Sequence, residues 1–155
     1  MTENYIDVFL NTVLPGLRIA VIGDMMVDRY VFGRVERISP EAPVPVNKVE
    51  RVSSVLGGAA NVAANLANLD CHVMAAGLVG DDDNAGLLRQ LLHTSAIDDS
   101  GLIVRPGHAT TTKMRVLGSR QQMVRLDFEE VTPLTTAEED ALAAWLQTQI
   151  QHGLD

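Results

Sequence analysis

Two patterns of apolar residues alternate along the 155-residue chain, and each predicts a different kind of element. Short apolar runs with β-branched residues, such as Ile19–Ile22, are typical of buried parallel strands. Longer stretches with apolar residues three and four apart predict amphipathic helices. This alternation of strands and helices indicates an α/β fold with a parallel sheet. We expect strands at 18–23, 72–79 and 101–104, and helices at 5–14, 59–69, 84–94 and 137–151.

Two polar signals mark helix starts. Thr136-x-x-Glu139 has the spacing of a capping box and predicts the start of the last helix, whose core stripe would be Leu142, Trp145, Leu146 and Ile150. Asp81–Asp83 places carboxylates at the start of the helix at 84–94, where the helix dipole favours negative charge.

The segment at 30–55 alternates in polarity and contains Pro40, Pro43 and Pro45. Because proline cannot donate to a strand ladder, this segment predicts edge strands outside the central sheet. Two further strands are expected around a three-residue loop, Gly118–Arg120. Together, segments at about 30–55 and 108–128 predict a small second β layer.

Composition indicates one soluble domain or part of one. The net charge of −8 argues against a nucleic-acid partner. No apolar run reaches the length that spans a bilayer, and Met1–Asn4 lacks the basic start of a signal peptide, so we expect a cytoplasmic protein without membrane contact. The single cysteine, Cys71, is expected to be a small core residue, and no metal site is predicted.

Gly57-Gly58-Ala59-Ala60-Asn61 opens an alanine-rich helix. Paired glycines allow a ligand to approach the backbone closely, and Asn61 can both donate and accept hydrogen bonds to hydroxyl groups. The alternative is a glycine-rich helix start that merely packs against a sheet.

Asp24 and Asp28 follow the first strand, where residues of an open α/β sheet line the ligand crevice. Both are candidate ligand-binding residues. In the alternative interpretation, Asp24 caps a turn and Asp28 pairs with Arg29.

These motifs, in this order, resemble those of the ribokinase-type (PfkB) sugar kinase family. The segments 37–46, 57–63 and 125–130 resemble, more narrowly, the heptose 7-phosphate kinase domains of bifunctional heptose kinase/adenylyltransferases. The resemblance runs from about Leu14 to Phe128 and implies a ribokinase-like parallel sheet flanked by helices, with a small β-lid. One departure is Asp70, which stands where the family has Gly or Ser and where a left-handed helix end is expected.

The resemblance implies ATP-dependent, Mg²⁺-dependent phosphorylation of the anomeric hydroxyl of heptose 7-phosphate, in the synthesis of ADP-heptose for the lipopolysaccharide core. Asp28 and Asn61 would hold sugar hydroxyls, Gly57 and Gly58 would allow close approach, and Asp24 would assist. The family's Gly-Ala-Gly-Asp motif, which carries the general base, does not occur in these 155 residues. We therefore expect an amino-terminal kinase half without a catalytic base, inactive alone and binding nucleotide poorly.

Basic residues gather in the second β layer of this acidic chain. With a three-residue loop, Lys113 would face Arg125 across two strands, with Arg115 on the same side. Like charges placed opposite each other are destabilising, and a substrate phosphate would relieve the conflict. The alternative is an edge strand protected by cations.

Three functions remain open: the heptose 7-phosphate kinase half, part of a kinase for another sugar such as fructose 1-phosphate or ribose, and a non-enzymatic module that binds sugar phosphate or associates through its lid. The resemblance also implies a homodimer through the lid, because the family's lids commonly pair between subunits.

Overall fold

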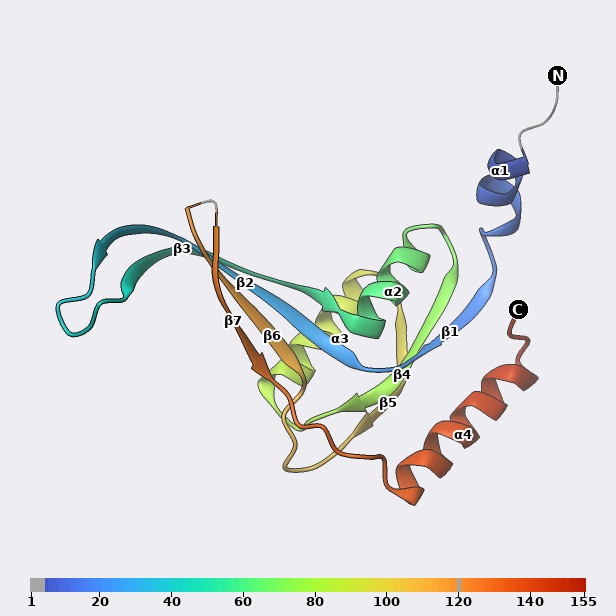
Figure 1. The fold of residues 1–155 in the computed structure, drawn as a ribbon. Helices are drawn as coiled ribbons and strands as arrows, with labels where there is room; N and C mark the ends of the chain where they lie inside the picture. The colour runs from blue at the N-terminus through green and yellow to red at the C-terminus, as the bar shows by residue number, and fades with distance from the viewer. Residues whose placement is uncertain (1–4, 120) are drawn as a thin grey trace.

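The computed structural model describes residues 5–119 and 121–155, which form two sheets (Figure 1). A parallel sheet has the strand order β1-β4-β5, and a mixed sheet has the order β3-β2-β6-β7. We call the parallel sheet with its helices the α/β unit and the mixed sheet the lid sheet. This arrangement confirms the expected α/β fold with a second β layer. The strands are β1 (Arg18–Ile22), β2 (Met25–Ile38), β3 (Pro45–Gly57), β4 (His72–Val79), β5 (Asp98–Val104), β6 (Thr112–Gly118) and β7 (Gln121–Phe128).

Helices α2 (Gly58–Ala67) and α3 (Asp83–Thr94) cover one face of the parallel sheet. Alternate residues of β4 point to this face, so Val73, Ala75 and Val79 join the core beneath these helices. The same cluster holds the fully buried leucines of α3 and the small alanines of α2. Cys71 is buried, as expected, and its Sγ lies 3.5 Å from the Leu14 carbonyl oxygen.

Helix α4 (Thr136–Gln151) lies against the opposite face, over β5. A Cβ on Gly101 would lie 2.8 Å from Trp145, whose indole nitrogen donates to Ser100. The expected core stripe of α4 is only partly confirmed. Leu142, Trp145 and Leu146 are half-buried, whereas Ile150 is 58% exposed.

Both helix-start signals appear in the structure, one of them shifted. Asp82 caps α3 by accepting from the Ala85 N–H at 3.0 Å. The capping box of α4 is formed by Thr135 and Glu138, so the prediction of Thr136 and Glu139 is wrong by one residue. The sequence Thr-Thr-x-Glu-Glu fits either spacing.

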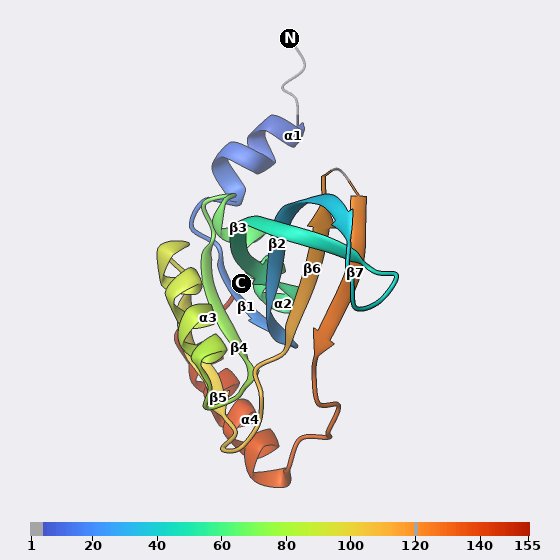
Figure 2. The ribbon, with the colours of Figure 1, turned by 90° about the vertical axis from the view of Figure 1, so that its left-hand side faces the viewer.

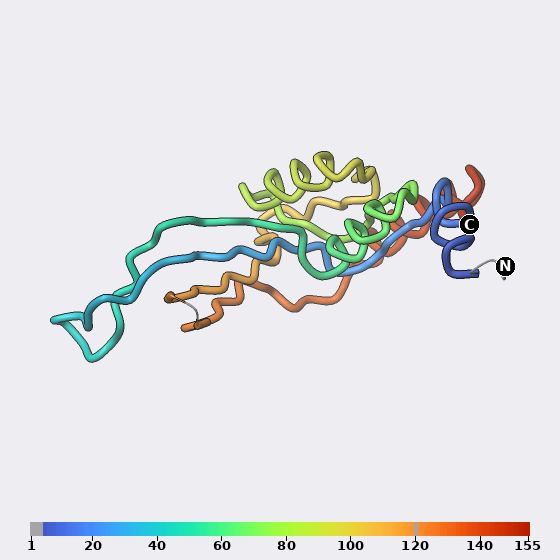
Figure 3. Tube along the Cα trace, turned by 90° about the horizontal axis from the view of Figure 1, so that it is seen from above, coloured from blue at the N-terminus to red at the C-terminus, as the bar shows by residue number. Residues whose placement is uncertain are grey.

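The β2–β3 hairpin reaches away from the helices as a long arm (Figure 3). Across the molecule from α3 and α4, strands β2, β6 and β7 lie side by side (Figure 2). The expectation of edge strands holds for β3 but is wrong for β2, which pairs with both β3 and β6. The prolines fall in the connection after β2 and at the first residue of β3, so β2 keeps its N–H groups.

The predicted amino-terminal helix is present as α1 (Tyr5–Val8), continued by a π-helical turn, Phe9–Val13. Its apolar residues remain exposed, and neither segment buries a residue. Asp70 has φ +61°, which confirms the left-handed helix end expected there.

Candidate functional site

The Gly57–Gly58 junction brings β3 and α2 against the start of β2. A Cβ on Gly57 would lie 2.9 Å from the Asp28 carboxyl carbon, and one on Gly58 would lie 2.5 Å from the Asp24 carbonyl oxygen. Gly58 also has φ +55°, which strongly favours glycine. Both glycines therefore make room for the chain's own aspartates. This close packing explains why glycine stands at both positions without invoking a ligand.

Asp28 is held by an arginine from the neighbouring strand. Arg115 Nη1 donates to Asp28 Oδ1 at 2.6 Å, and the two side chains are about one-fifth exposed. This hydrogen bond raises the pKa of Arg115. The Arg115 guanidinium also lies 5.3 Å from the centroid of the Tyr30 ring. The alternative pairing of Asp28 with Arg29 is wrong, because Arg29 donates instead to Ser54 and Asn84.

Asn61 lies in the first turn of α2, with an exposed side chain. The N-cap residue Gly57 has no side chain to cap this helix. First-turn N–H groups of such a helix attract anions and polar ligands. The structure thus places Gly57 beside Asp28 and Gly58 beside Asp24, with Asn61 in the first turn of the helix that Gly58 begins.

The pairing of β6 with β7 differs from the prediction. Lys113 lies opposite Asp127, and Arg115 lies opposite Arg125, so the expected pairing of Lys113 with Arg125 is wrong. Two residues, not three, connect the strands, and the ladder shifts by another residue near its end. A β-bulge of this kind leaves no simple sequence signal.

The other two cations predicted to bind phosphate, Lys113 and Arg125, also have carboxylate partners. Lys113 Nζ lies 3.3 Å from Glu129 Oε2 and 3.9 Å from Asp127 Oδ2. Arg125 makes a two-pronged contact with Asp127, at 2.9 and 3.0 Å. Carboxylates thus relieve the repulsion that had suggested a bound anion. Arg120, a fourth basic residue of this segment, lies outside the described residues.

A cavity of about 340 Å³ lies at the carboxyl ends of β1 and β4, where open α/β sheets bind ligands. Among the predicted site residues, Asp24 and Lys113 line it, and the other six lie outside its wall. The rest of its wall combines apolar side chains with His108, Glu129, Glu130 and Thr132. The lining residues are 22–26, 77–79, 108, 109, 111, 113, 129–132, 134 and 142.

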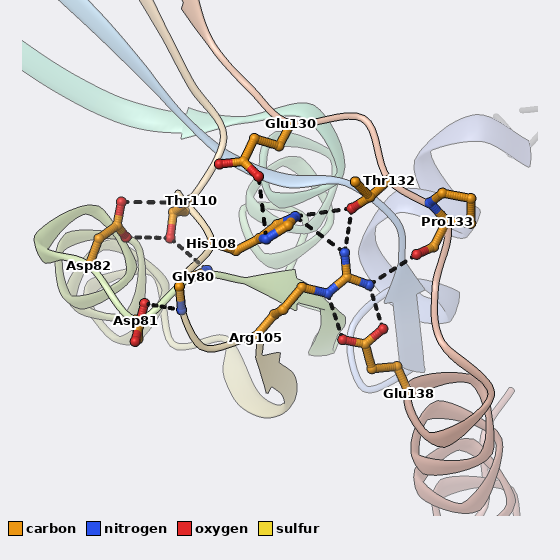
Figure 4. Close-up of polar contacts among 11 residues, drawn as sticks. Gly80, Asp81, Asp82, Arg105, His108, Thr110, Glu130, Thr132, Pro133 and Glu138 are labelled. Atoms are coloured by element: carbon orange, nitrogen blue, oxygen red, sulfur yellow. Dashed lines mark hydrogen bonds and ion pairs between the residues drawn. The ribbon is translucent and has the colours of Figure 1, made fainter.

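A hydrogen-bond network fixes the outer wall of this cavity (Figure 4). Its centre is Arg105, which the sequence did not single out, and Arg105 binds Glu138 in the first turn of α4. Hydrogen bonds from Arg105 and from the Thr135 N–H lower the pKa of Glu138 to about 2. The Thr-x-x-Glu motif was a signal for Glu138, whereas Arg105 had none.

A second network secures the base of the 105–112 connection to the end of β4 (Figure 4). Burial alone would raise the pKa of Asp82, but hydrogen bonds from Thr110 and the Ala85 N–H outweigh it and lower the pKa. The Thr110 hydroxyl donates to Asp82 and accepts from the Gly80 N–H. These contacts place Thr111 and Lys113 beside the cavity.

The described residues contain no group of three or more His, Cys, Asp and Glu side chains that could bind a metal ion. No helix among them is long and apolar enough to cross a membrane.

Comparisons with known proteins agree on one family. The sequence pattern of "pfkB family carbohydrate kinase" matches residues 17–151. Proteins named "Bifunctional protein HldE" are similar: that of Wolinella succinogenes is 41% identical over 132 residues, 85% of this chain and 28% of the relative. That of Magnetococcus marinus is 50% identical over 116 residues, 75% of this chain and 23% of the relative. The chain thus spans about a quarter of these relatives.

Solved structures show the same fold. A putative sugar kinase from Clostridium perfringens matches with a TM-score of 0.63 and 17% identity, over 86% of this chain and 40% of that one. Ribokinase from Cryptococcus neoformans in complex with ADP matches with a TM-score of 0.54 and 17% identity, over 79% and 38%. The α/β unit with its lid sheet is therefore part of a ribokinase-like fold.

Proposed function

The chain belongs to the pfkB family of carbohydrate kinases, as its motifs had indicated, and we propose that it is the sugar-binding part of a heptose 7-phosphate kinase. The observation that supports this most is the Asp28–Arg115 pair beside Gly57 and Gly58. It places an oriented carboxylate next to an uncapped helix start that carries Asn61. Carboxylate and amide groups together can bind several sugar hydroxyls.

In this proposal the sugar lies between the lid sheet and the carboxyl ends of β1 and β4. Asp28 and Asn61 bind its hydroxyl groups, and Asp24 assists from the cavity wall. The substrate phosphate is bound by Lys113, with Arg115 and Arg125 as further candidates. Lys113 is the strongest of the three, because it lines the cavity and is a half-buried ammonium group.

The family implies ATP and Mg²⁺ as cosubstrate and cofactor of the whole kinase. The described residues contain no group of three or more His, Cys, Asp and Glu side chains that could bind a metal ion, and the chain contains no Gly-Ala-Gly-Asp motif for the general base. We therefore assign no step of phosphoryl transfer to this chain. In the whole kinase, its contribution would be to bind and orient the sugar, in a cytoplasmic pathway that leads to ADP-heptose.

We further propose that two copies associate through the lid sheet. One face of that sheet carries Val52, Val124, Leu126 and Phe128, which are all exposed. A contiguous apolar face of this kind is typical of a protein–protein contact. Sedimentation at increasing concentration tests this: a dimer lost in Leu126→Glu supports it, and a monomer throughout contradicts it.

Calorimetric titration of this chain tests the substrate. D-glycero-β-D-manno-heptose 7-phosphate is expected to bind more tightly than heptose, fructose 1-phosphate or ribose. Asp28→Asn keeps the shape of the side chain and should abolish binding, whereas Asp140→Asn, on the exposed side of α4, should not. Tighter binding of another sugar would show that this other sugar is the substrate. If no sugar binds, the proposal of a sugar-binding function is wrong, and a module that only associates with a second copy is the remaining interpretation.

A further inference from the structure

The Arg105 side chain is fully engaged and largely buried. Its five N–H donors all have acceptors in reach. Nε donates to Glu138 Oε1 at 2.7 Å, and Nη2 donates to Glu138 Oε2 and to the Pro133 carbonyl oxygen at 3.1 Å. Nη1 donates to Thr132 Oγ1 at 2.5 Å and lies 3.3 Å from His108 Nε2. Only 13% of the side chain is exposed.

These bonds join three separate stretches of chain (Figure 4). Arg105 itself follows β5 and is anchored by its backbone N–H, which donates to the Val79 carbonyl oxygen at 2.8 Å. Glu138 belongs to α4, and Thr132 belongs to the segment at 129–134 that joins β7 to α4. That segment has neither helical nor strand structure, and its Val131 is 93% exposed. Its position therefore depends on side-chain contacts such as those of Arg105.

The network also fixes the imidazole of His108. The ring nitrogen Nε2 lies 3.3 Å from Arg105 Nη1 and 3.0 Å from Thr132 Oγ1, and Nδ1 lies 3.4 Å from Glu130 Oε2. His108 is thus held from both sides of its ring, and it links Arg105 to a carboxylate of the cavity wall.

We propose that Arg105 is a positioning residue for the sugar site: it holds the segment at 129–134 as a fixed wall of the cavity. This inference rests on the proposed function, in which Lys113 binds the substrate phosphate. The wall includes Glu129, which forms an ion pair with Lys113. Arg105 itself does not line the cavity and acts through the side chains that it holds. Without the clamp, the wall would occupy many positions, and the binding groups would lose their orientation.

The test uses two substitutions and a matched control. Arg105→Gln removes the charge and most donors, and Arg105→Lys keeps the charge but loses the planar fork. The control is Arg89→Gln. Arg89 pairs with Asp99, and Asp99 also contacts His93, so these residues form a similar network between α3 and β5. None of the three lines the cavity.

Two measurements separate positioning from general stability. The first is calorimetric affinity for heptose 7-phosphate, expected to fall about tenfold in both Arg105 variants and to stay unchanged in Arg89→Gln. The second is the distance distribution between spin labels at Val131→Cys and Val62→Cys, in a Cys71→Ala background. It is expected to be narrow in the otherwise unchanged chain and in the control, and broad in both Arg105 variants.

Unchanged affinity in Arg105→Gln despite a broadened distribution would overturn the positioning role. An unchanged distribution would show that Arg105 does not hold the wall. Full recovery of both measurements in Arg105→Lys would mean that charge alone suffices, which also contradicts the clamp. If the unchanged chain binds no sugar, the proposed function fails, and the label distances still decide whether Arg105 fixes the segment.

Discussion

Strand β4 of the α/β unit and strand β7 of the lid sheet each have eight residues, but six residues of β4 are buried and all eight of β7 are exposed. Strand β4 lies between two neighbours with helices on both faces, whereas β7 is an edge strand with no helix over it. The α/β unit therefore contains most of the apolar core. In strand β7, Arg125 and Asp127 lie on one face of the lid sheet, and Val124, Leu126 and Phe128 lie on the other, an arrangement that suits binding better than it suits stability.

The largest effect should come from removing core volume in the α/β unit. Leu88 of α3 is fully buried, so Leu88→Ala is expected to lower the free energy of unfolding by about 3–5 kcal/mol. The matched change in the lid sheet, Leu126→Ala, removes a half-exposed side chain and should cost less than about 1 kcal/mol. Urea denaturation of both variants measures the difference.

Similar costs for the two changes would mean that the lid sheet is as well packed as the core. Should the cost of Leu126→Ala grow with protein concentration, a second copy covers this residue, because subunit association makes stability depend on concentration.

The second prediction concerns the charged face of the lid sheet. Lys113→Met keeps the length of the side chain but removes its charge, and it should weaken heptose 7-phosphate binding about ten- to a hundredfold. Binding of unphosphorylated heptose should stay the same. Arg125→Ala is the informative partner, because its side chain is half-exposed and already engaged with Asp127. We expect a smaller loss there.

Calorimetry with both ligands distinguishes the outcomes. Equal weakening for heptose and its 7-phosphate in Lys113→Met would show that Lys113 does not bind the phosphate. The cations would then be an edge-protecting surface, as in the alternative interpretation.

The third prediction concerns Glu138 of α4, which binds Arg105 at the start of the connection from β5 to the lid sheet. The folded-state pKa of Glu138 is about 2, against an ordinary value of 4.5, so its ionised form stabilises the fold. This contribution is complete above pH 4.5 and is lost as the pH falls from about 4.5 to about 2. Glu138→Gln should remove that part of the acid dependence.

Carboxyl NMR titration checks this directly, with Glu139 as an internal comparison on the same helix turn. A midpoint for Glu138 near 4.5 in the unchanged chain would contradict the network, as would a midpoint that stays near 2 in Arg105→Gln.

The sequence predicted the α/β unit better than the lid sheet, for a physical reason. Strand β4 has the expected bounds because a fully buried strand is a continuous apolar run. The pairing of Lys113 with Asp127 depends on a bulge and a two-residue turn, which involve no apolar pattern. Similarly, Asp28 and Gly57 were recognisable as motif residues, but the contact of Arg105 with Glu138 joins residues 33 positions apart.

The smallest effect is expected at Asp70, which ends the turn after α2 with a left-handed backbone. Its φ of +61° places a residue with a Cβ in the left-handed region, which costs roughly 1 kcal/mol for most side chains. Asp70→Gly removes this strain but adds freedom to the unfolded chain, so the net gain should be about 0.5 kcal/mol. Asp70→Asn is the control for charge, since asparagine also tolerates this conformation and should gain less. Thermal and urea unfolding measure both variants, and a loss of stability in Asp70→Gly would show that the Asp70 side chain stabilises this turn more than its backbone strains it.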